Sequence, residues 1–152
     1  MNLGIMTFKR VRDAVRGLMK QFQQREEPLV LAITNRYPTR IALYAAAFQG
    51  NWRVHFMKSL REAAEASQGQ RPIGVFYDQS CADPAWGRYC SSLSGEGIPF
   101  VFLADKSDDE IFLNVMAAGG YLACSDPLTS EEIVKAMDLA GEFAGLVNVP
   151  VV

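Results

Sequence analysis

Residues 72–78 are Pro-Ile-Gly-Val-Phe-Tyr-Asp, a short apolar run that ends in a single carboxylate. A continuous apolar run of this length is typical of a strand that is buried on both faces of a parallel sheet. Asp78 is therefore expected at the C-terminal end of that strand. In a parallel sheet covered by helices, the C-terminal ends of the strands form the edge where ligand crevices lie.

Similar apolar runs occur on both sides of this stretch and alternate with segments of helical character. Apolar runs of strand length predict further strands at residues 29–33, 52–57, 99–103 and 121–124. Capping signals and helical composition predict helices between and after them, at residues 39–49, 59–67, 83–93, 107–119 and 129–144. The predicted capping residues are Ser59, Asp83, Ser107 and Thr129. Strict alternation of this kind predicts an α/β fold with parallel strands and helices on both faces.

One predicted helix, residues 7–25, precedes the alternating elements. Its apolar residues recur at helical spacing, and segment 1–27 carries a net charge of +3, which leaves −5 for the remainder. We therefore divide the chain into an N-terminal amphipathic helix, 1–27, and a domain, 28–152. The large apolar side chains of this helix are expected to be covered, and three possibilities are open: the helix packs on the domain, pairs with its copy in a dimer, or lies on an anionic membrane surface. Contact in a dimer or with a partner is favoured, because the basic face is modest for membrane binding.

Composition excludes several function classes. A net charge of −2 gives no overall field that would attract nucleic acid. Three cysteines without a CxxC pair, together with a single histidine, argue against a disulfide framework and a zinc site. No apolar run approaches the ~20 residues of a membrane span, and no signal peptide is recognisable, so a cytoplasmic protein is expected.

The residues that directly follow the predicted strands are the candidates for a site. They are Thr34 and Asn35 after the first strand, Asp78 after the third, Ala104 and Asp105 after the fourth, and Ser125 and Asp126 after the fifth. In the loop after the first strand, Arg36 and Arg40 are expected to be solvated, in preference to binding an anion.

Four stretches carry a resemblance to a known family. Residues 72–78 resemble the third strand of a receiver domain, which ends in the phosphoacceptor aspartate, and residues 98–104 resemble its fourth strand. Residues 118–120 and the later Asp126-Pro127 are similar to the Ala-Gly-Ala and Lys-Pro elements around the fifth strand, and residues 128–133 resemble the start of the last helix. From residue 29 to about 145, the chain thus resembles CheY-like response-regulator receivers. The resemblance implies a three-layer, flavodoxin/CheY-like, doubly wound sheet of five parallel strands in the order 2-1-3-4-5, here with an extra N-terminal helix.

The chemistry of that family needs five groups, of which this chain keeps one. Two acids after the first strand and the acceptor aspartate hold Mg²⁺, and a hydroxyl and a lysine bind the phosphoryl group. Here Asp78 matches the acceptor, but Thr34 and Asn35 replace the acids, Ala104 replaces the hydroxyl and Asp126 replaces the lysine. Asp78 is therefore expected to be a relic that accepts a hydrogen bond from a nearby backbone donor. No metal is expected, Asp78 and Asp126 being weak candidate ligands, and Mg²⁺ would be needed only if phosphorylation is retained.

The leading hypothesis is a stand-alone pseudo-receiver, not an enzyme, that acts in signal transduction through protein–protein contact. Its partner would be a histidine kinase or an effector, bound at the surface formed by residues 107–119, 121–124 and 129–144. A homodimer through that face or through the N-terminal helix is a further expectation. Two alternatives stay open: an atypical response regulator phosphorylated on Asp78, and a flavodoxin-like small-ligand binder, although no glycine-rich phosphate loop follows the first strand.

Overall fold

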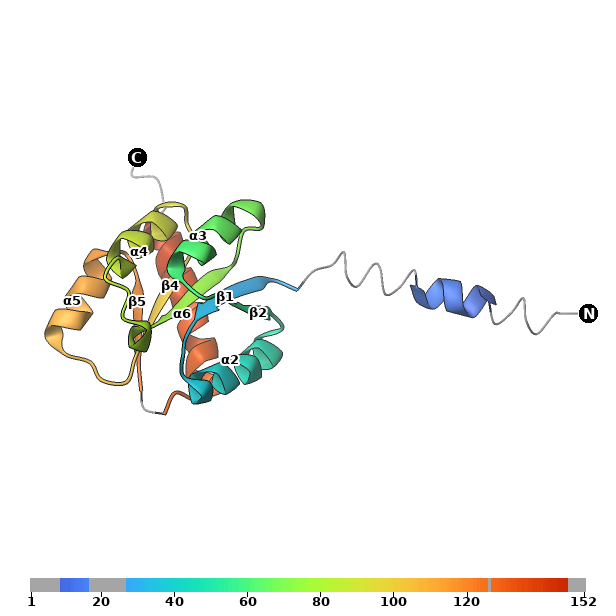
Figure 1. Cartoon of the computed structure of the whole chain (residues 1–152), viewed down its shortest axis with the longest axis horizontal. Helices are drawn as coiled ribbons and strands as arrows, with labels where there is room; N and C mark the ends of the chain where they lie inside the picture. Colours follow the sequence, from blue (N-terminus) through green and yellow to red (C-terminus); the bar gives the residue numbers. More distant parts are fainter. Residues whose placement is uncertain (1–8, 17–26, 126, 148–152) are drawn as a thin grey trace, which may run out of the picture.

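The computed structural model describes residues 9–16, 27–125 and 127–147. Within these ranges, five parallel strands form one sheet in the order β2-β1-β3-β4-β5, with helices on both faces (Figure 1). The predicted three-layer α/β architecture and its strand order are confirmed. In chain order the elements are β1 (Leu29–Ile33), α2 (Tyr37–Gly50), β2 (Arg53–Phe56), α3 (Leu60–Gly69), β3 (Gly74–Asp78), the short 3₁₀ helix η1 (Gln79–Cys81), α4 (Trp86–Gly95), β4 (Phe100–Ala104), α5 (Asp109–Ala117), β5 (Tyr121–Cys124) and α6 (Ser130–Val147).

The register of the sheet brings the strand ends together at one edge. Ile33 at the end of β1 pairs with Tyr77 in β3, and Asp78 pairs with Leu103 in β4. Ala104 at the end of β4 pairs with Cys124 of β5. The residues that follow β1, β3, β4 and β5 therefore border one edge, as parallel pairing requires.

Two apolar clusters hold the helices against the sheet. On one face, α3, α4 and α5 contribute buried side chains such as Leu60, Cys90 and Val115. On the other face, α2 and α6 lie side by side and contribute Leu43 and Ile133. β1, β3 and β4 are buried along their whole length, which explains why their sequences are continuous apolar runs.

Helix starts agree with the predicted capping signals at two positions and differ at two others. The hydroxyls of Ser59 and Thr129 accept the backbone N–H groups expected of capping residues. For α5, however, Asp108 rather than Ser107 is the cap, because its carboxylate accepts from the Ile111 N–H at 2.7 Å. The predicted cap Asp83 lies before α4, which begins at Trp86, and its carboxylate accepts from the Ala85 N–H at 2.9 Å. Residues 79–81 form a 3₁₀ helix that was not predicted.

The predicted N-terminal helix is seen in part. Residues 9–16 are helical and exposed, and the rest of the predicted range 7–25 lies outside the described residues. Among the described residues, no helix combines the length and the apolar character that crossing a membrane requires. Cys81, Cys90 and Cys124 are free thiols, in line with the composition.

Candidate functional site

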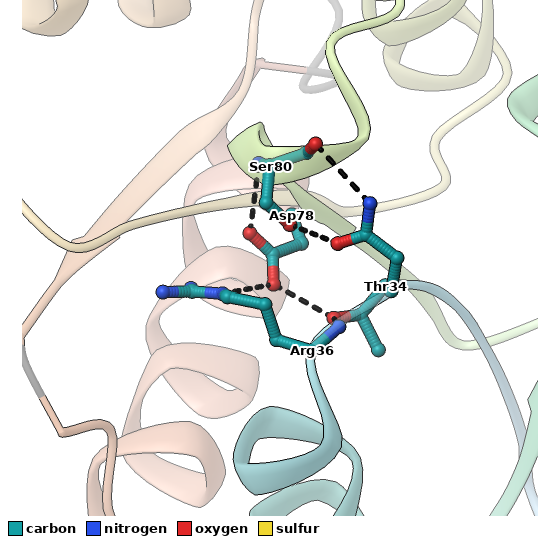
Figure 2. A network of polar contacts seen from close by, with 5 residues as sticks. Thr34, Arg36, Asp78 and Ser80 are labelled. Atoms are coloured by element: carbon teal, nitrogen blue, oxygen red, sulfur yellow. Dashed lines mark hydrogen bonds and ion pairs between the residues drawn. The ribbon is translucent and has the colours of Figure 1, made fainter.

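Asp78 is a fully buried carboxylate at the end of β3, in the middle of the sheet edge (Figure 2). Its Oδ2 atom accepts a hydrogen bond from the Thr34 hydroxyl at 2.7 Å and another from Nε of Arg36 at 2.8 Å. Its Oδ1 atom accepts from the backbone N–H of Ser80 at 3.0 Å. The predicted backbone hydrogen bond is thus confirmed, and two side-chain donors accompany it.

These contacts decide the charge state of the buried group. Burial raises the pKa of Asp78, but the hydrogen bonds from Arg36, Ser80 and Thr34 together lower it below the ordinary aspartate value. Desolvation penalises the ionised form, whereas each of these donors stabilises it. Asp78 is therefore an ionised carboxylate at neutral pH.

A second set of hydrogen bonds connects the loop after β1 to the loop after β3. The Asn35 amide donates to the Ser80 backbone carbonyl at 3.3 Å and accepts from the Ser80 hydroxyl at 2.6 Å. The Thr34 hydroxyl, which donates to Asp78, also accepts from the Arg36 N–H at 3.1 Å. Thr34 and Asn35, the two residues in the place of the family's acid pair, thus hold the β1–α2 loop to β3 and the residues after it by hydrogen bonds. Figure 2 shows the contact of Thr34 with Asp78.

The expectation that Arg36 is simply solvated is wrong. Its guanidinium forms an ion pair with Asp78, and its side chain is only 31% exposed while that of Asp78 is 1% exposed. The replacement of the family's lysine by Asp126 suggested that the positive group of this site had been lost, but Arg36 supplies one directly beside the candidate acceptor. A buried carboxylate needs a partner of opposite charge, and this requirement is the physical signal that could have identified Arg36 from the sequence.

The remaining candidate positions differ in what the structure shows. Ala104 is fully buried at the end of β4, and its methyl group offers no hydrogen bond where the family has a hydroxyl. Asp126 lies outside the described residues. Its neighbours Ser125 and Pro127 line a small hollow of about 80 Å³ together with Arg36, so the end of β5 does reach the same edge.

A cavity of about 360 Å³ opens above the carboxylate. It is lined by Arg36, Asp78, Gln79, Ser80 and Asp105. Asp105, which directly follows β4, is exposed and was among the sequence-predicted residues at the strand ends. The cavity therefore combines one guanidinium with two carboxylates.

The residues around Asp78 do not fit the Mg²⁺ site that the receiver fold implies. Magnesium prefers an octahedral shell of oxygen atoms. Both oxygen atoms of Asp78 already accept hydrogen bonds, and the Arg36 guanidinium at 2.8 Å would repel a dication. Over residues 9–16, 27–125 and 127–147, no three His, Cys, Asp or Glu side chains gather into a group that could hold a metal.

A second and larger cavity, of about 530 Å³, lies between the start of α4 and α5. Its lining includes Tyr77, Asp83, Trp86, Phe102 and Ile111. The Tyr77 hydroxyl accepts a hydrogen bond from the Asp83 N–H at 2.7 Å. The ring of Trp86 packs against that of Phe102, with 4.7 Å between the ring centroids. Tyr77 and Trp86 therefore serve the packing of this region as well as lining it.

The sequence matches no family model and no curated protein. Solved structures do match the fold. A response regulator from Thermotoga maritima has a TM-score of 0.66 at 16% identity, with 76% of this chain and 98% of that one covered. The chemotaxis protein CheY4 of Vibrio cholerae has a TM-score of 0.62 at 17% identity, with coverage of 75% and 98%. The signal receiver domain of an HD domain-containing protein from Pseudomonas fluorescens has a TM-score of 0.65 at 14% identity, with coverage of 80% and 92%.

These matches agree with the strand order and with the resemblance found in the sequence. The chain has the CheY-like receiver fold, and it covers nearly the whole length of these three structures. Identities of 14–17% establish the fold alone, so the function has to be argued from the site.

Proposed function

We propose that this chain is a pseudo-receiver: a non-enzymatic, cytoplasmic signalling module that acts through contact with other proteins and needs no metal or cofactor. The observation that carries the proposal is the engagement of Asp78. A phosphoacceptor carboxylate must present a free oxygen atom to phosphorus, with metal and positive charge on the incoming group. Here Oδ2 accepts hydrogen bonds from Thr34 and Arg36, and Oδ1 accepts one from the Ser80 N–H, so each oxygen atom is already engaged by the protein.

The hydrogen bonds also weaken Asp78 as a nucleophile. Donors that lower the pKa of a carboxylate stabilise its lone pairs, and the lone pairs are what would attack phosphorus. In the receiver mechanism the positive charge acts on the phosphoryl oxygens, but in this chain Arg36 is paired with the nucleophile itself. The arrangement supports a fixed, unphosphorylated state.

The surface proposed for partner contact is formed by α5, β5 and α6. Phe112, Leu113 and Met116 on α5 are large apolar residues that remain substantially exposed. Acidic side chains at Asp108 and Glu110 lie at the start of the same helix. A partner, such as a histidine kinase or an effector, that offers apolar side chains with basic residues beside them would match this surface.

The test is a phosphorylation assay on the intact chain. We expect no mass increment of a phosphoryl group after incubation with acetyl phosphate and excess Mg²⁺, while a metal-dependent receiver treated in parallel is modified. Asp78→Asn serves as the matched control. Uptake of one phosphoryl group by the wild-type chain but not by Asp78→Asn would overturn the proposal and identify an atypical phosphoacceptor.

That phosphoacceptor is the second candidate, and one observation supports it. Arg36 lines the cavity above Asp78, and a guanidinium is a strong ligand for phosphoryl oxygens. For Asp78 to react, Arg36 would have to release the carboxylate and bind the donor. The mass assay distinguishes the two functions directly.

The cavity of about 530 Å³ supports the third hypothesis, a small-ligand binder, because its volume is within the range of ligand pockets. The chain lacks a glycine-rich loop after β1, so a nucleotide or flavin phosphate would find no backbone cradle there. We expect no change in melting temperature with flavin mononucleotide or ATP. A saturable increase would favour the ligand-binding function instead.

A further inference from the structure

The outer face of α2 is apolar, although it points away from the core. Its exposed large side chains are Tyr37 (73% exposed), Ile41 (51%), Tyr44 (56%) and Phe48 (88%). The inner face of the same helix is also apolar and packs on the sheet through residues such as Leu43. A surface helix normally carries polar side chains outward, and a helix that is hydrophobic all round is normally covered on all sides.

The spacing of these residues is that of a helix–helix seam. Positions 37, 41, 44 and 48 follow one another at intervals of four, three and four, so they form a single stripe along α2. This is the a/d pattern by which two helices pack together. The Phe56 ring at the sheet edge extends the stripe, since it contacts the Tyr44 ring with 5.0 Å between centroids.

The stripe carries almost no charge. Arg40 is the one charged residue in the sequence of α2, and its guanidinium lies over the Phe56 ring, 4.4 Å from the centroid. A basic partner would thus find no acidic group on α2, and an acidic partner would find only Arg40, whose guanidinium already lies on the Phe56 ring. The basic N-terminal segment gains nothing there by ion pairing, because α2 contains no acidic residue.

A membrane surface suits α2 poorly for a related reason. Helices that lie on membranes place lysine and arginine along a polar face that remains in water. The face of α2 opposite the stripe is instead buried against the sheet through Leu43, Ala46 and Ala47. An uncharged aromatic stripe is best matched by another uncharged aromatic stripe.

We propose that the stripe formed by Tyr37, Ile41, Tyr44 and Phe48 is the interface of a homodimer, in which α2 of one chain packs against α2 of a second copy. A twofold axis brings identical surfaces together, as isologous interfaces require. This contact does not depend on the proposed function. The stripe lies on α2 and includes no residue of α5 or β5, where the surface for a different partner is proposed.

The area is sufficient for a specific contact. An aromatic side chain offers about 200 Å², so the exposed parts of Tyr37, Tyr44 and Phe48 amount to roughly 400 Å² on each chain. With Ile41 and the bordering residues added, a symmetric pair would bury about 1,000 Å² in total, near the lower limit of specific interfaces. A reversible dimer with a dissociation constant in the micromolar range is therefore expected.

The test measures the mass of the full chain in solution by sedimentation velocity over a series of concentrations. We expect the wild-type chain to move from monomer to dimer, and Phe48→Glu to raise the dissociation constant at least about tenfold. Tyr37→Glu is a second variant with the same expected effect. Its new carboxylate lies in the first turn of α2, where the helix dipole favours negative charge, so the fold should tolerate it.

Two control variants locate the contact. Leu113→Glu changes an exposed residue on α5, and Val15→Glu changes one in the helical segment 9–16, so neither should affect dimerisation. A chain that stays monomeric throughout the series, or a dimer that both α2 variants leave intact, would overturn the proposal. A dimer that Val15→Glu or Leu113→Glu abolishes would also overturn it, since the interface would then lie on another face. Binding of a monomeric chain to neutral or anionic lipid vesicles would identify a membrane as the occupant and would count against the dimer.

Discussion

Replacing Arg36 with methionine measures what the ion pair with Asp78 contributes to stability. Methionine keeps an unbranched apolar side chain but removes the guanidinium that donates to Asp78 at 2.8 Å. Removing one partner of a fully buried pair costs about 3–5 kcal/mol. Arg36 is nearly one-third exposed, and neutral donors from Thr34 and Ser80 remain, so we expect a loss of about 2 kcal/mol in the free energy of unfolding.

The assay is urea unfolding at neutral pH together with thermal melting. A domain of this size loses about 4 °C of melting temperature per kcal/mol, so Arg36→Met should melt roughly 8 °C lower than the wild type. Arg61→Met is the matched control. Arg61 also forms an ion pair through Nε, to Glu65 at 3.3 Å, but both side chains are largely exposed and little change is expected.

The pH dependence of this loss has a definite sign. Because the pKa of Asp78 is lowered in the folded state, its stabilisation is complete above the ordinary aspartate value of about 4 and is lost as the pH falls through the lowered value. The difference in the free energy of unfolding between wild type and Arg36→Met should therefore be largest at neutral pH and should decrease under acid conditions. A loss no larger than that of Arg61→Met, or a difference that does not change with pH, would refute the account of the site.

Three further predictions concern single positions. Thr34→Val, which removes the hydroxyl that donates to the buried carboxylate, should cost about 1–2 kcal/mol in urea unfolding, whereas Thr34→Ser should be nearly neutral; equal losses would argue against the hydrogen bond. Gly119 has a φ of +85°, so Gly119→Ala should lower the free energy of unfolding by about 1 kcal/mol. Gly95→Ala adds a Cβ that meets open space at the end of α4, so it should raise the free energy of unfolding slightly. Changes of the same sign in the two variants would contradict this backbone argument. Burial raises the pKa of Cys90 to about 12, so iodoacetamide should alkylate exposed Cys124 well before Cys90 in the native protein, as read by peptide mass spectrometry; early alkylation of Cys90 would show that this part of the core opens.

The fold could be predicted from the sequence because its signals are local and redundant. Each central strand is a continuous apolar run, such as residues 29–33 and 99–103, and parallel pairing is the arrangement that buries such strands on both faces. Helix boundaries were less certain where two polar residues compete for one cap. Asp108 takes the role predicted for Ser107, since a carboxylate at this position also suits the helix dipole.

The site was predicted only as a set of positions. Asp78, Thr34, Asn35 and Ala104 follow from the rule that strand ends share one edge, and the structure places them there. The hydrogen-bond and ion-pair partners of these residues could not be predicted from that rule. Contacts between loops 42–45 residues apart, such as the one between Arg36 and Asp78, depend on side-chain rotamers and on local turns that periodicity does not encode.

The position of Arg36 explains why an aspartate can persist at this edge without its phosphorylation partners. A carboxylate buried without compensation would be costly, and loss of the acid pair and metal would leave Asp78 in that condition. The loop directly after β1 supplies Asp78 with the guanidinium of Arg36 and the hydroxyl of Thr34. Ser80, the second residue after β3, supplies a backbone N–H donor. The same aspartate then joins two loops of the sheet edge, so its presence has a structural cause that requires no phosphoryl transfer. An aspartate at the end of β3 is therefore not by itself evidence for phosphorylation, because in this chain Asp78 is fully buried and both of its oxygen atoms accept hydrogen bonds from the protein.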